Sequence, residues 1–143
     1  MITICRIGFI IVGLFLGLGS AGASAEVVAV VSANNPVSTL SKSEVADMFL
    51  GKMTRFPDGR QVLPIDQVEN SSEREEFYLK FAGKAPAQIK AYWSKIIFTG
   101  RGQPPPEVSN DIEVKKFIAK HPGAIGYIEQ KWVDDSVKVI RTK

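Results

Sequence analysis

The sequence predicts an α/β domain in which helices alternate with strands. Residues 26–32 are apolar and rich in valine, which is typical of a strand buried on both faces of a sheet. Apolar residues then recur at helical spacing in four later segments. Short apolar runs at residues 124–128 and 137–140 predict further strands near the end of the chain.

The first 25 of the 143 residues have the layout of a secretory signal peptide. Arg6 precedes an apolar run at residues 7–18, and small residues follow up to Ala25, after which we expect cleavage. A retained membrane anchor is the alternative, but the run is shorter than the roughly 20 residues that a spanning helix needs. Residues 26–143 remain, which is the usual size of one domain.

Charge and cysteine content narrow the function classes. Cys5 lies ahead of the apolar run, so the cleaved protein has no thiol for a disulfide or a metal. All 15 acidic residues and 17 of the 18 basic residues follow residue 25, which gives a net charge of about +2. This small excess suits a small anion and does not indicate nucleic acid. His121, the single histidine, is expected at a helix end, so we predict no cofactor, no metal and no enzyme activity.

The first helix is predicted to begin at Ser41, because Glu44 completes a capping box with it. Leu40 and Val45 flank this box at the spacing of a hydrophobic staple, and Gly51 ends the helix. Turn residues at positions 56–60 then lead into a strand expected at residues 61–66. The apolar residues expected on the buried face of this helix are Val45, Met48 and Phe49.

Three more helices follow in the second half of the chain. The second is expected from about Ser72, and the third from Pro86, which is well placed at a first helical position. A loop rich in glycine and proline at residues 99–106 separates them from a fourth helix, capped at Asn110 with Glu113 three residues later. The residues expected in the core are Phe77, Tyr78 and Phe81, then Ile89, Tyr92, Trp93 and Ile96, then Val114, Phe117 and Ile118.

Four segments taken in order resemble a known family. They are residues 40–59, the strand and polar loop at 62–72, the Gly-Arg-Gly sequence at 100–102, and the Pro-Gly-Ala-Ile-Gly-Tyr sequence at 122–127. Together they are similar to the second lobe of periplasmic phosphate-binding proteins of ABC transporters. The resemblance spans roughly residues 40–128, and it implies a single periplasmic-binding-protein-like lobe with a mixed sheet flanked by about four helices. It also implies a periplasmic solute-binding protein.

The polar loop Asn70-Ser71-Ser72 is the leading candidate for an anion site. A strand, a short polar loop and a helix leave free backbone N–H groups at the positive end of a helix dipole. Family members hold phosphate with a Ser/Gly/Thr loop at this place, so the resemblance implies Ser71 and Ser72 as ligands and Arg74 as a charge partner. The alternative is that Ser72 only caps the helix, with Glu75 completing a capping box.

Arg101 is the second candidate for the anion site. Gly100 and Gly102 around it allow close backbone approach, so its guanidinium could reach an anion held near Ser71. An exposed flexible connection with an incidental charge is the alternative.

Two departures from the family argue against tight phosphate binding. The family's glycines are absent from residues 69–74, and carboxylates crowd the start of the helix. Only residues 26–39 precede the matched part, which is too short for a first lobe, so a second copy or another protein would have to complete the site. The carboxylates belong to Glu69, Glu73, Glu75 and Glu76.

Three functional hypotheses follow. The first is an exported relative of phosphate ABC transporter substrate-binding proteins that binds phosphate or another small oxyanion, with a homodimer as one way to complete the site. The second is a non-catalytic periplasmic interaction module that has lost ligand binding and docks on an envelope transporter, sensor or porin. An exported hydrolase is the least supported, because the sequence shows no acid/base pair.

The signal peptide generates a first testable prediction. When the full chain is expressed in a Gram-negative host, the mature protein should begin at Glu26 and appear in the soluble periplasmic fraction. N-terminal sequencing and cell fractionation measure both properties. Uncleaved protein in the membrane fraction would contradict the prediction.

Overall fold

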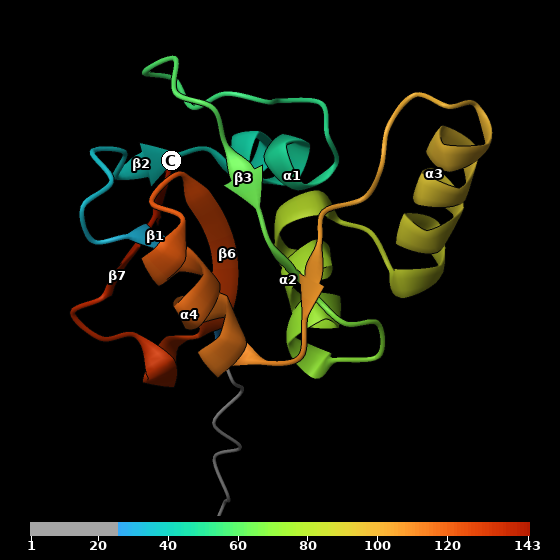
Figure 1. Ribbon diagram of the computed structural model, residues 1–143. Helices are drawn as coiled ribbons and strands as arrows, with labels where there is room; N and C mark the ends of the chain where they lie inside the picture. Colours follow the sequence, from blue (N-terminus) through green and yellow to red (C-terminus); the bar gives the residue numbers. More distant parts are fainter. Residues whose placement is uncertain (1–25) are drawn as a thin grey trace, which may run out of the picture.

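The computed structural model describes residues 26–143, so the predicted signal peptide lies outside the described residues (Figure 1). None of the helices within this range combines the length and the apolar character needed to cross a bilayer. Along the chain the elements are β1 (Val27–Ser32), β2 (Thr39–Leu40), α1 (Lys42–Phe49), β3 (Leu63–Pro64), β4 (Asp66–Gln67), α2 (Ser72–Ala82), α3 (Pro86–Phe98), β5 (Glu107–Val108), α4 (Asp111–Lys120), β6 (Ala124–Glu129), the 3-10 helix η1 (Gln130–Trp132), β7 (Val137–Val139) and β8 (Arg141–Thr142).

The main sheet has four strands in the order β3-β6-β1-β7. β1 pairs antiparallel with both β6 and β7, whereas β3 pairs parallel with β6. The predicted mixed sheet with four flanking α-helices is therefore confirmed. Two short parallel pairs, β2 with β8 and β4 with β5, form separate small sheets that the sequence did not predict.

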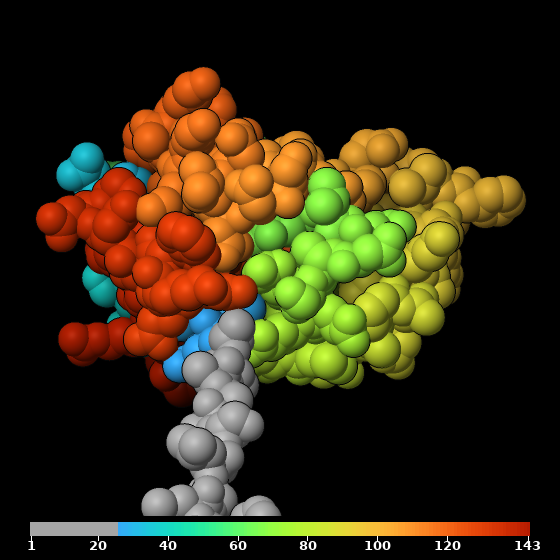
Figure 2. Space-filling model, turned by 90° about the horizontal axis from the view of Figure 1, so that it is seen from below, coloured from blue at the N-terminus to red at the C-terminus, as the bar shows by residue number. Residues whose placement is uncertain are grey.

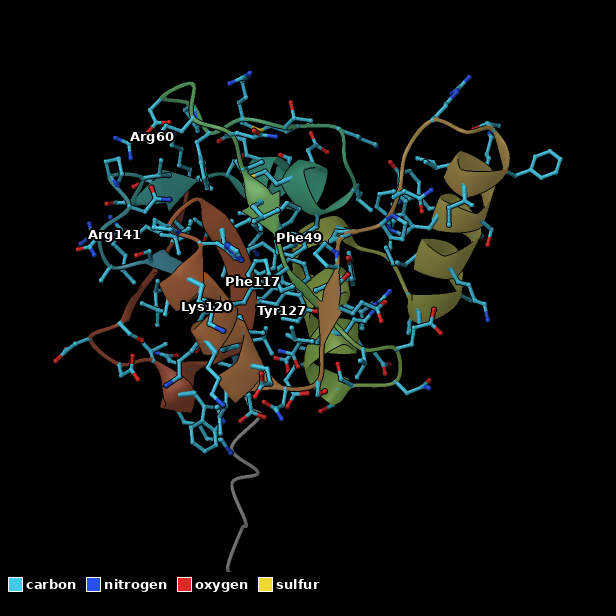
Figure 3. The ribbon with its side chains drawn as sticks, in the orientation of Figure 1. Phe49, Arg60, Phe117, Lys120, Tyr127 and Arg141 are labelled. Atoms are coloured by element: carbon cyan, nitrogen blue, oxygen red, sulfur yellow. The ribbon has the colours of Figure 1, made fainter. Side chains whose placement is uncertain are left out.

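The strand β1 is buried on both faces, as its continuous apolar sequence predicts. One face carries the larger part of the core, under α1 and α2, and Phe77 stacks on Tyr127 there with ring centroids 4.0 Å apart. Phe49 meets the same pair at 4.6 Å from Phe77 (Figure 3). On the other face, α4 packs Val114 and Ile118 against the sheet.

Two predicted helix caps are confirmed. The Ser41 hydroxyl accepts a hydrogen bond from the Glu44 N–H at 3.0 Å, and the Glu44 carboxylate accepts one from the Ser41 N–H at 2.9 Å. At the start of α4, the Asn110 side chain accepts a bond from the Glu113 N–H at 3.0 Å. These bonds satisfy N–H groups that have no partner within the helix.

The strand expected at residues 61–66 is divided into two parts. Its first part, β3, pairs with β6, and the Leu63 N–H bonds the Gly123 carbonyl oxygen. The Ile65 N–H still bonds the Ile125 carbonyl oxygen of β6, and the chain then changes partner, since the Asp66 N–H donates to the Pro106 carbonyl oxygen beside β5. The prediction was wrong in assuming one sheet, since sequence alone does not show β5 as a partner.

The helix α3 packs on the body through one side only. Ile89 and Trp93 are its buried residues, and the Tyr92 hydroxyl donates to the Leu50 carbonyl oxygen at 2.6 Å. Its last turn contributes no buried residue. In the view from below, the gold end of α3 projects beyond the rest of the surface (Figure 2).

A buried polar network joins the strand β4 to α2, α4 and β6. The Asp66 carboxylate accepts hydrogen bonds from the Tyr127 hydroxyl and, at 2.6 Å, from the Tyr78 hydroxyl. The Gln67 N–H donates to both Asp66 and Tyr127, at 2.9 and 3.1 Å. The Gln67 side chain donates to Asp111 at 2.7 Å, which adds the start of α4 to the network.

Burial sets the proton affinities of this network. Desolvation raises the pKa of Asp66, and the nearby Arg74 guanidinium and the two tyrosine hydroxyls reduce that rise without cancelling it. Desolvation and the Asp66 charge together raise the pKa values of Tyr78 and Tyr127 far above their usual range. Both tyrosines therefore stay protonated and act as hydrogen-bond donors.

Gly126 lies where β6 packs closely under α4, and a substitution there measures how tight this packing is. A Cβ atom at this position would lie 2.5 Å from Val114 Cγ1 and 3.0 Å from Ile65 Cγ2, both in the core. We expect Gly126→Ala to lower the free energy of unfolding by about 1–3 kcal/mol through overpacking. Urea denaturation measures this, and Gly102→Ala is the control, because its Cβ would meet only Ile96 at 3.7 Å.

Asp66 should give the stability a defined pH dependence. Its raised pKa means that the folded state binds the proton more tightly than the unfolded state does. The stability gained from this tighter proton binding is fully present below the ordinary pKa of 3.8, and it is lost as the pH rises through the pKa of Asp66 in the folded state. The unfolding free energy of wild type minus that of Asp66→Asn should therefore fall from acid toward neutral pH. Urea denaturation at a series of pH values measures it, and a rising difference would contradict the assignment.

Candidate functional site

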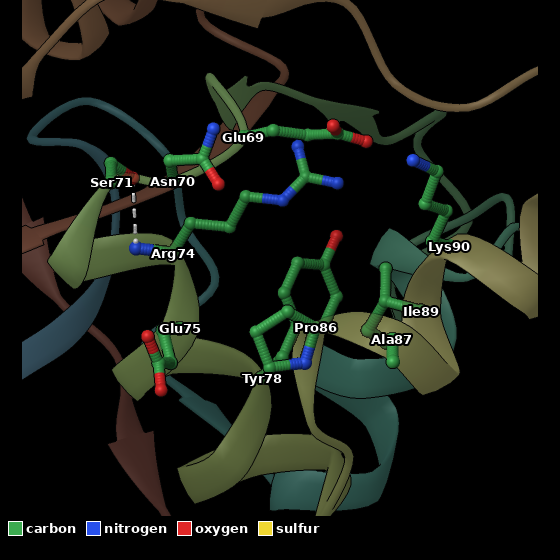
Figure 4. Close-up of a pocket in the computed structure, with 10 residues that line it drawn as sticks. All are labelled: Glu69, Asn70, Ser71, Arg74, Glu75, Tyr78, Pro86, Ala87, Ile89 and Lys90. Carbon is green, nitrogen blue, oxygen red and sulfur yellow. Dashed lines mark hydrogen bonds between the residues drawn. The ribbon is translucent and has the colours of Figure 1, made fainter.

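A hollow of about 200 Å³ lies between the starts of α2 and α3 (Figure 4). It combines polar and apolar walls, and it takes side chains from both helices and from the loop before α2. The residues that line it are Glu69, Asn70, Ser71, Arg74, Glu75, Tyr78, Pro86, Ala87, Ile89 and Lys90.

The loop before α2 positions one wall of this cavity. Asn70 adopts the left-handed region with φ 70°, which asparagine tolerates better than most residues. The following Ser71 then caps α2, because its hydroxyl accepts a hydrogen bond from the Arg74 N–H at 3.1 Å. The cap is therefore Ser71, and the alternative that Ser72 caps the helix was wrong by one residue. Ser72 is the first residue of α2 and does not line the cavity.

Arg74 is held in place by three groups of the protein. Its Nη1 donates to the Gln67 carbonyl oxygen at 2.8 Å and to Glu107 Oε1 at 2.9 Å, and it lies 3.6 Å from Asp66 Oδ2. Desolvation opposes its charge, yet the attraction of Asp66 and the other acidic neighbours raises the pKa of Arg74 above its ordinary value. The guanidinium is thus a fixed cation with part of its charge already paired.

Two cations and one hydroxyl face the same space from the helices α2 and α3. Figure 4 shows the Arg74 guanidinium, the Tyr78 hydroxyl and the Lys90 ammonium turned toward the middle of the cavity. Lys90, which the sequence did not predict as a site residue, lies on the exposed side of α3 next to the buried Ile89. The position of Lys90 in the helical pattern predicts only that it lies on the solvent-exposed face of α3. That it lies across the cavity from Arg74 depends on how α3 packs beside α2.

Two carboxylates, from Glu69 and Glu75, also line the cavity and offset the charges of Arg74 and Lys90. The electrostatic potential for an anion is therefore modest. The N-cap of α2, Ser71, lines the cavity, so the positive end of the helix dipole lies beside it. The arrangement suits a small oxyanion held mainly by hydrogen bonds.

The other sequence candidate, Arg101, is not part of this cavity. It follows the end of α3, whereas the cavity is formed at the start of that helix. A helix of 13 residues spans about 20 Å, so the two positions lie at opposite ends of α3. Of the five candidate residues, Asn70, Ser71 and Arg74 meet at one site, and Ser72 and Arg101 lie outside it.

Two other sets of polar side chains lie outside this cavity. Glu73, Asp111 and Glu129 place carboxylate oxygens within 4.8 Å of one another. Asp111 accepts from the Gln67 side chain and from the Glu129 N–H, and Lys131 lies 3.0 Å from Glu129.

The single histidine, His121, is the C-cap of α4 and packs on Phe117 with ring centroids 4.4 Å apart. This places it at a helix end, as expected from the sequence.

Comparison with solved structures identifies the fold. No protein-family model and no curated protein sequence matches the chain. A phosphate ABC transporter substrate-binding protein from Clostridium perfringens, solved with bound phosphate, is 22% identical with a TM-score of 0.61, over 80% of this chain and 43% of that one. An ABC-type phosphate transport receptor from Vibrio cholerae is 20% identical with a TM-score of 0.62, over 80% and 44%.

PstS from Borrelia burgdorferi is also similar, at 14% identity and a TM-score of 0.57, over 82% of this chain and 47% of that one. At these identities the likeness concerns the fold, and the chain spans less than half the length of each of these proteins. The chain has the fold of a single lobe of the phosphate ABC transporter substrate-binding proteins.

Proposed function

We propose that this protein is exported and binds phosphate or another small oxyanion in the cavity between the starts of α2 and α3. The observation that carries the proposal is the convergence of the Arg74 guanidinium and the Lys90 ammonium from two helices on one cavity, beside the loop that caps α2. Cations, hydroxyls and helix N-termini are the groups that recognise oxyanions in proteins. A solved protein of similar fold carries bound phosphate, which supports the same ligand class.

Each element would have a distinct role in binding. The first turn of α2 would donate backbone N–H groups, and the Ser71 cap would fix the loop that exposes them. Lys90 would supply a mobile charge, because it is exposed, whereas the guanidinium of Arg74 is already fixed by its partners. Tyr78 would form a wall of the site and not a donor to the anion, because the single proton of its hydroxyl is donated to Asp66.

Binding by this chain alone should be weak. Glu69 and Glu75 oppose an anion at short range, and Arg74 would have to share its donors with Glu107. The walls of the cavity also come from a single lobe, so a bound ligand would keep part of its surface in water. We propose that a second copy of the chain, or an envelope transporter or sensor protein, completes the site.

Lys90 provides the sharpest test of this site. Isothermal titration calorimetry of the 26–143 protein should show saturable binding of phosphate, with sulfate as the comparison anion. Lys90→Gln should weaken phosphate binding about three- to tenfold, because it removes one charge-assisted hydrogen bond at a partly solvated site. Lys95→Gln is the matched control, since Lys95 is an exposed lysine of the same helix outside the cavity, and its affinity should equal that of wild type.

Two outcomes would overturn the assignment. An absence of saturable heat at high phosphate concentration would favour the interaction module that has lost ligand binding. Equal losses of phosphate affinity in Lys90→Gln and Lys95→Gln would mean that phosphate binding depends on the overall charge of the protein and not on this cavity.

A further inference from the structure

The C-terminal end of α3 exposes an unusual apolar tip. Phe98 is 92% exposed and its neighbour Ile97 is 47% exposed. Within residues 26–143, no other large apolar side chain is as exposed as Phe98. Exposure of a phenylalanine to water costs free energy that burial would recover, so such a tip is typical of a surface that meets another apolar phase.

The chain around this tip is uniformly cationic. Residues 84–106 include Lys84, Lys90, Lys95 and Arg101 and contain no acidic residue. Lys95 and Arg101 stand three residues on either side of Phe98, and both are exposed.

The loop between α1 and β3 lies at the same upper end of the molecule as the tip (Figure 1). It adds the exposed Lys52, Arg55 and Arg60, against one carboxylate, Asp58. Arg60 is seen at that end in Figure 3.

The opposite end of the molecule carries the opposite charge. The starts of α2 and α4 lie at the lower end in Figure 1, and they contribute Glu73, Glu75, Glu76, Asp111 and Glu113. The protein is thus polarised along its length, although its net charge is close to neutral. A polarised protein approaches an anionic surface with its basic end first.

We infer that the basic end, with Phe98 at its tip, docks on an anionic lipid surface. Phe98 and Ile97 would insert among the headgroups and upper acyl chains, while Lys95, Arg101 and the basic loop residues contact lipid phosphates. A protein partner fits less well, because two apolar side chains give far less than the roughly 800 Å² per partner of a stable interface. A lipid surface needs only a small apolar insertion inside a basic rim.

This docking would leave the proposed anion site accessible. The cavity lies at the start of α3 and Phe98 at its end, and the lining residues between Pro86 and Lys90 are about 12–18 Å from Phe98 along the helix axis. Insertion of the tip would therefore place the cavity away from the lipid, where it can exchange ligand with the surrounding solution.

Vesicle sedimentation of the 26–143 protein tests the inference. The protein should sediment with vesicles of phosphatidylcholine and phosphatidylglycerol, remain free with phosphatidylcholine alone, and be released by high salt, which screens the charges. Phe98→Ser should weaken binding to the anionic vesicles at least about tenfold, because the inserted ring is lost. Lys95→Gln should weaken it about fivefold, since one surface cation is worth a comparable factor.

Matched controls carry the same chemical changes at the opposite end. Trp132→Ser removes a 41% exposed aromatic residue in η1, and Lys131→Gln removes an exposed lysine beside it. Both should bind anionic vesicles as wild type does. Equal binding to the two kinds of vesicle, no binding to either, or unchanged binding of Phe98→Ser would overturn the inference.

Two further measurements separate this inference from its competitors. If Phe98→Ser turns a dimer into a monomer in sedimentation velocity while wild type ignores vesicles, the tip is an interface between copies and the lipid inference is wrong. Phosphate titration of Phe98→Ser should match wild type, so failure at the lipid surface and failure of the proposed anion site are distinguishable. Inorganic phosphate at constant ionic strength should not release the protein from vesicles.

Discussion

The buried Asp66 carboxylate is the group on which the rest of this lobe depends. It accepts hydrogen bonds from Tyr78 of α2 and Tyr127 of β6, and it lies beside Arg74. A carboxylate in an apolar core is tolerated only when donors surround it, and here they come from two elements that are far apart in the chain, α2 and β6. Each donor therefore fixes one element relative to the others. The start of α2, where the proposed anion site lies, is positioned by this network.

The same network limits what the site can do. Arg74 faces the cavity, yet it also balances Asp66 and Glu107, so an incoming anion competes with groups that already hold the guanidinium. Lys90 has no such structural task in the network and lies on a different helix. Recognition of an anion would then depend on how α3 packs beside α2. The site is built by the contact between two helices and not by one loop.

The direction of the helices explains how the charges are distributed. α2 and α4 begin at the lower end in Figure 1, α3 begins higher, and all three run upward. Acidic residues in the first turns of α2 and α4 compensate the positive ends of their dipoles, and each of the three helices has a lysine in its last turn. Because these helices run in the same direction, the acidic N-terminal turns of α2 and α4 lie toward one end of the molecule and the basic C-terminal turns toward the other. One end of the lobe becomes acidic and the other basic, although each helix alone has an ordinary charge pattern.

The sequence by itself determined the class of fold, the four helices and the buried central strand. These features depend on local rules, since the capping box at Ser41, the cap at Asn110 and the all-apolar β1 act through neighbouring residues. It also predicted three residues that line the cavity, because Asn70, Ser71 and Arg74 lie close together in a single loop and helix start.

Only the tertiary structure decided which groups meet. It divided the strand at residues 61–66 between two sheets, brought Lys90 into the cavity and moved Arg101 about 20 Å away along α3. These outcomes depend on contacts between residues that are far apart in the chain, and periodicity and capping carry no information about such contacts. The sequence predicted α3 as a helix packed on the core, whereas its C-terminal end projects from the surface. This difference has the same cause. Its stripe of Ile89 and Trp93 is buried as predicted, but the packing ends before Phe98.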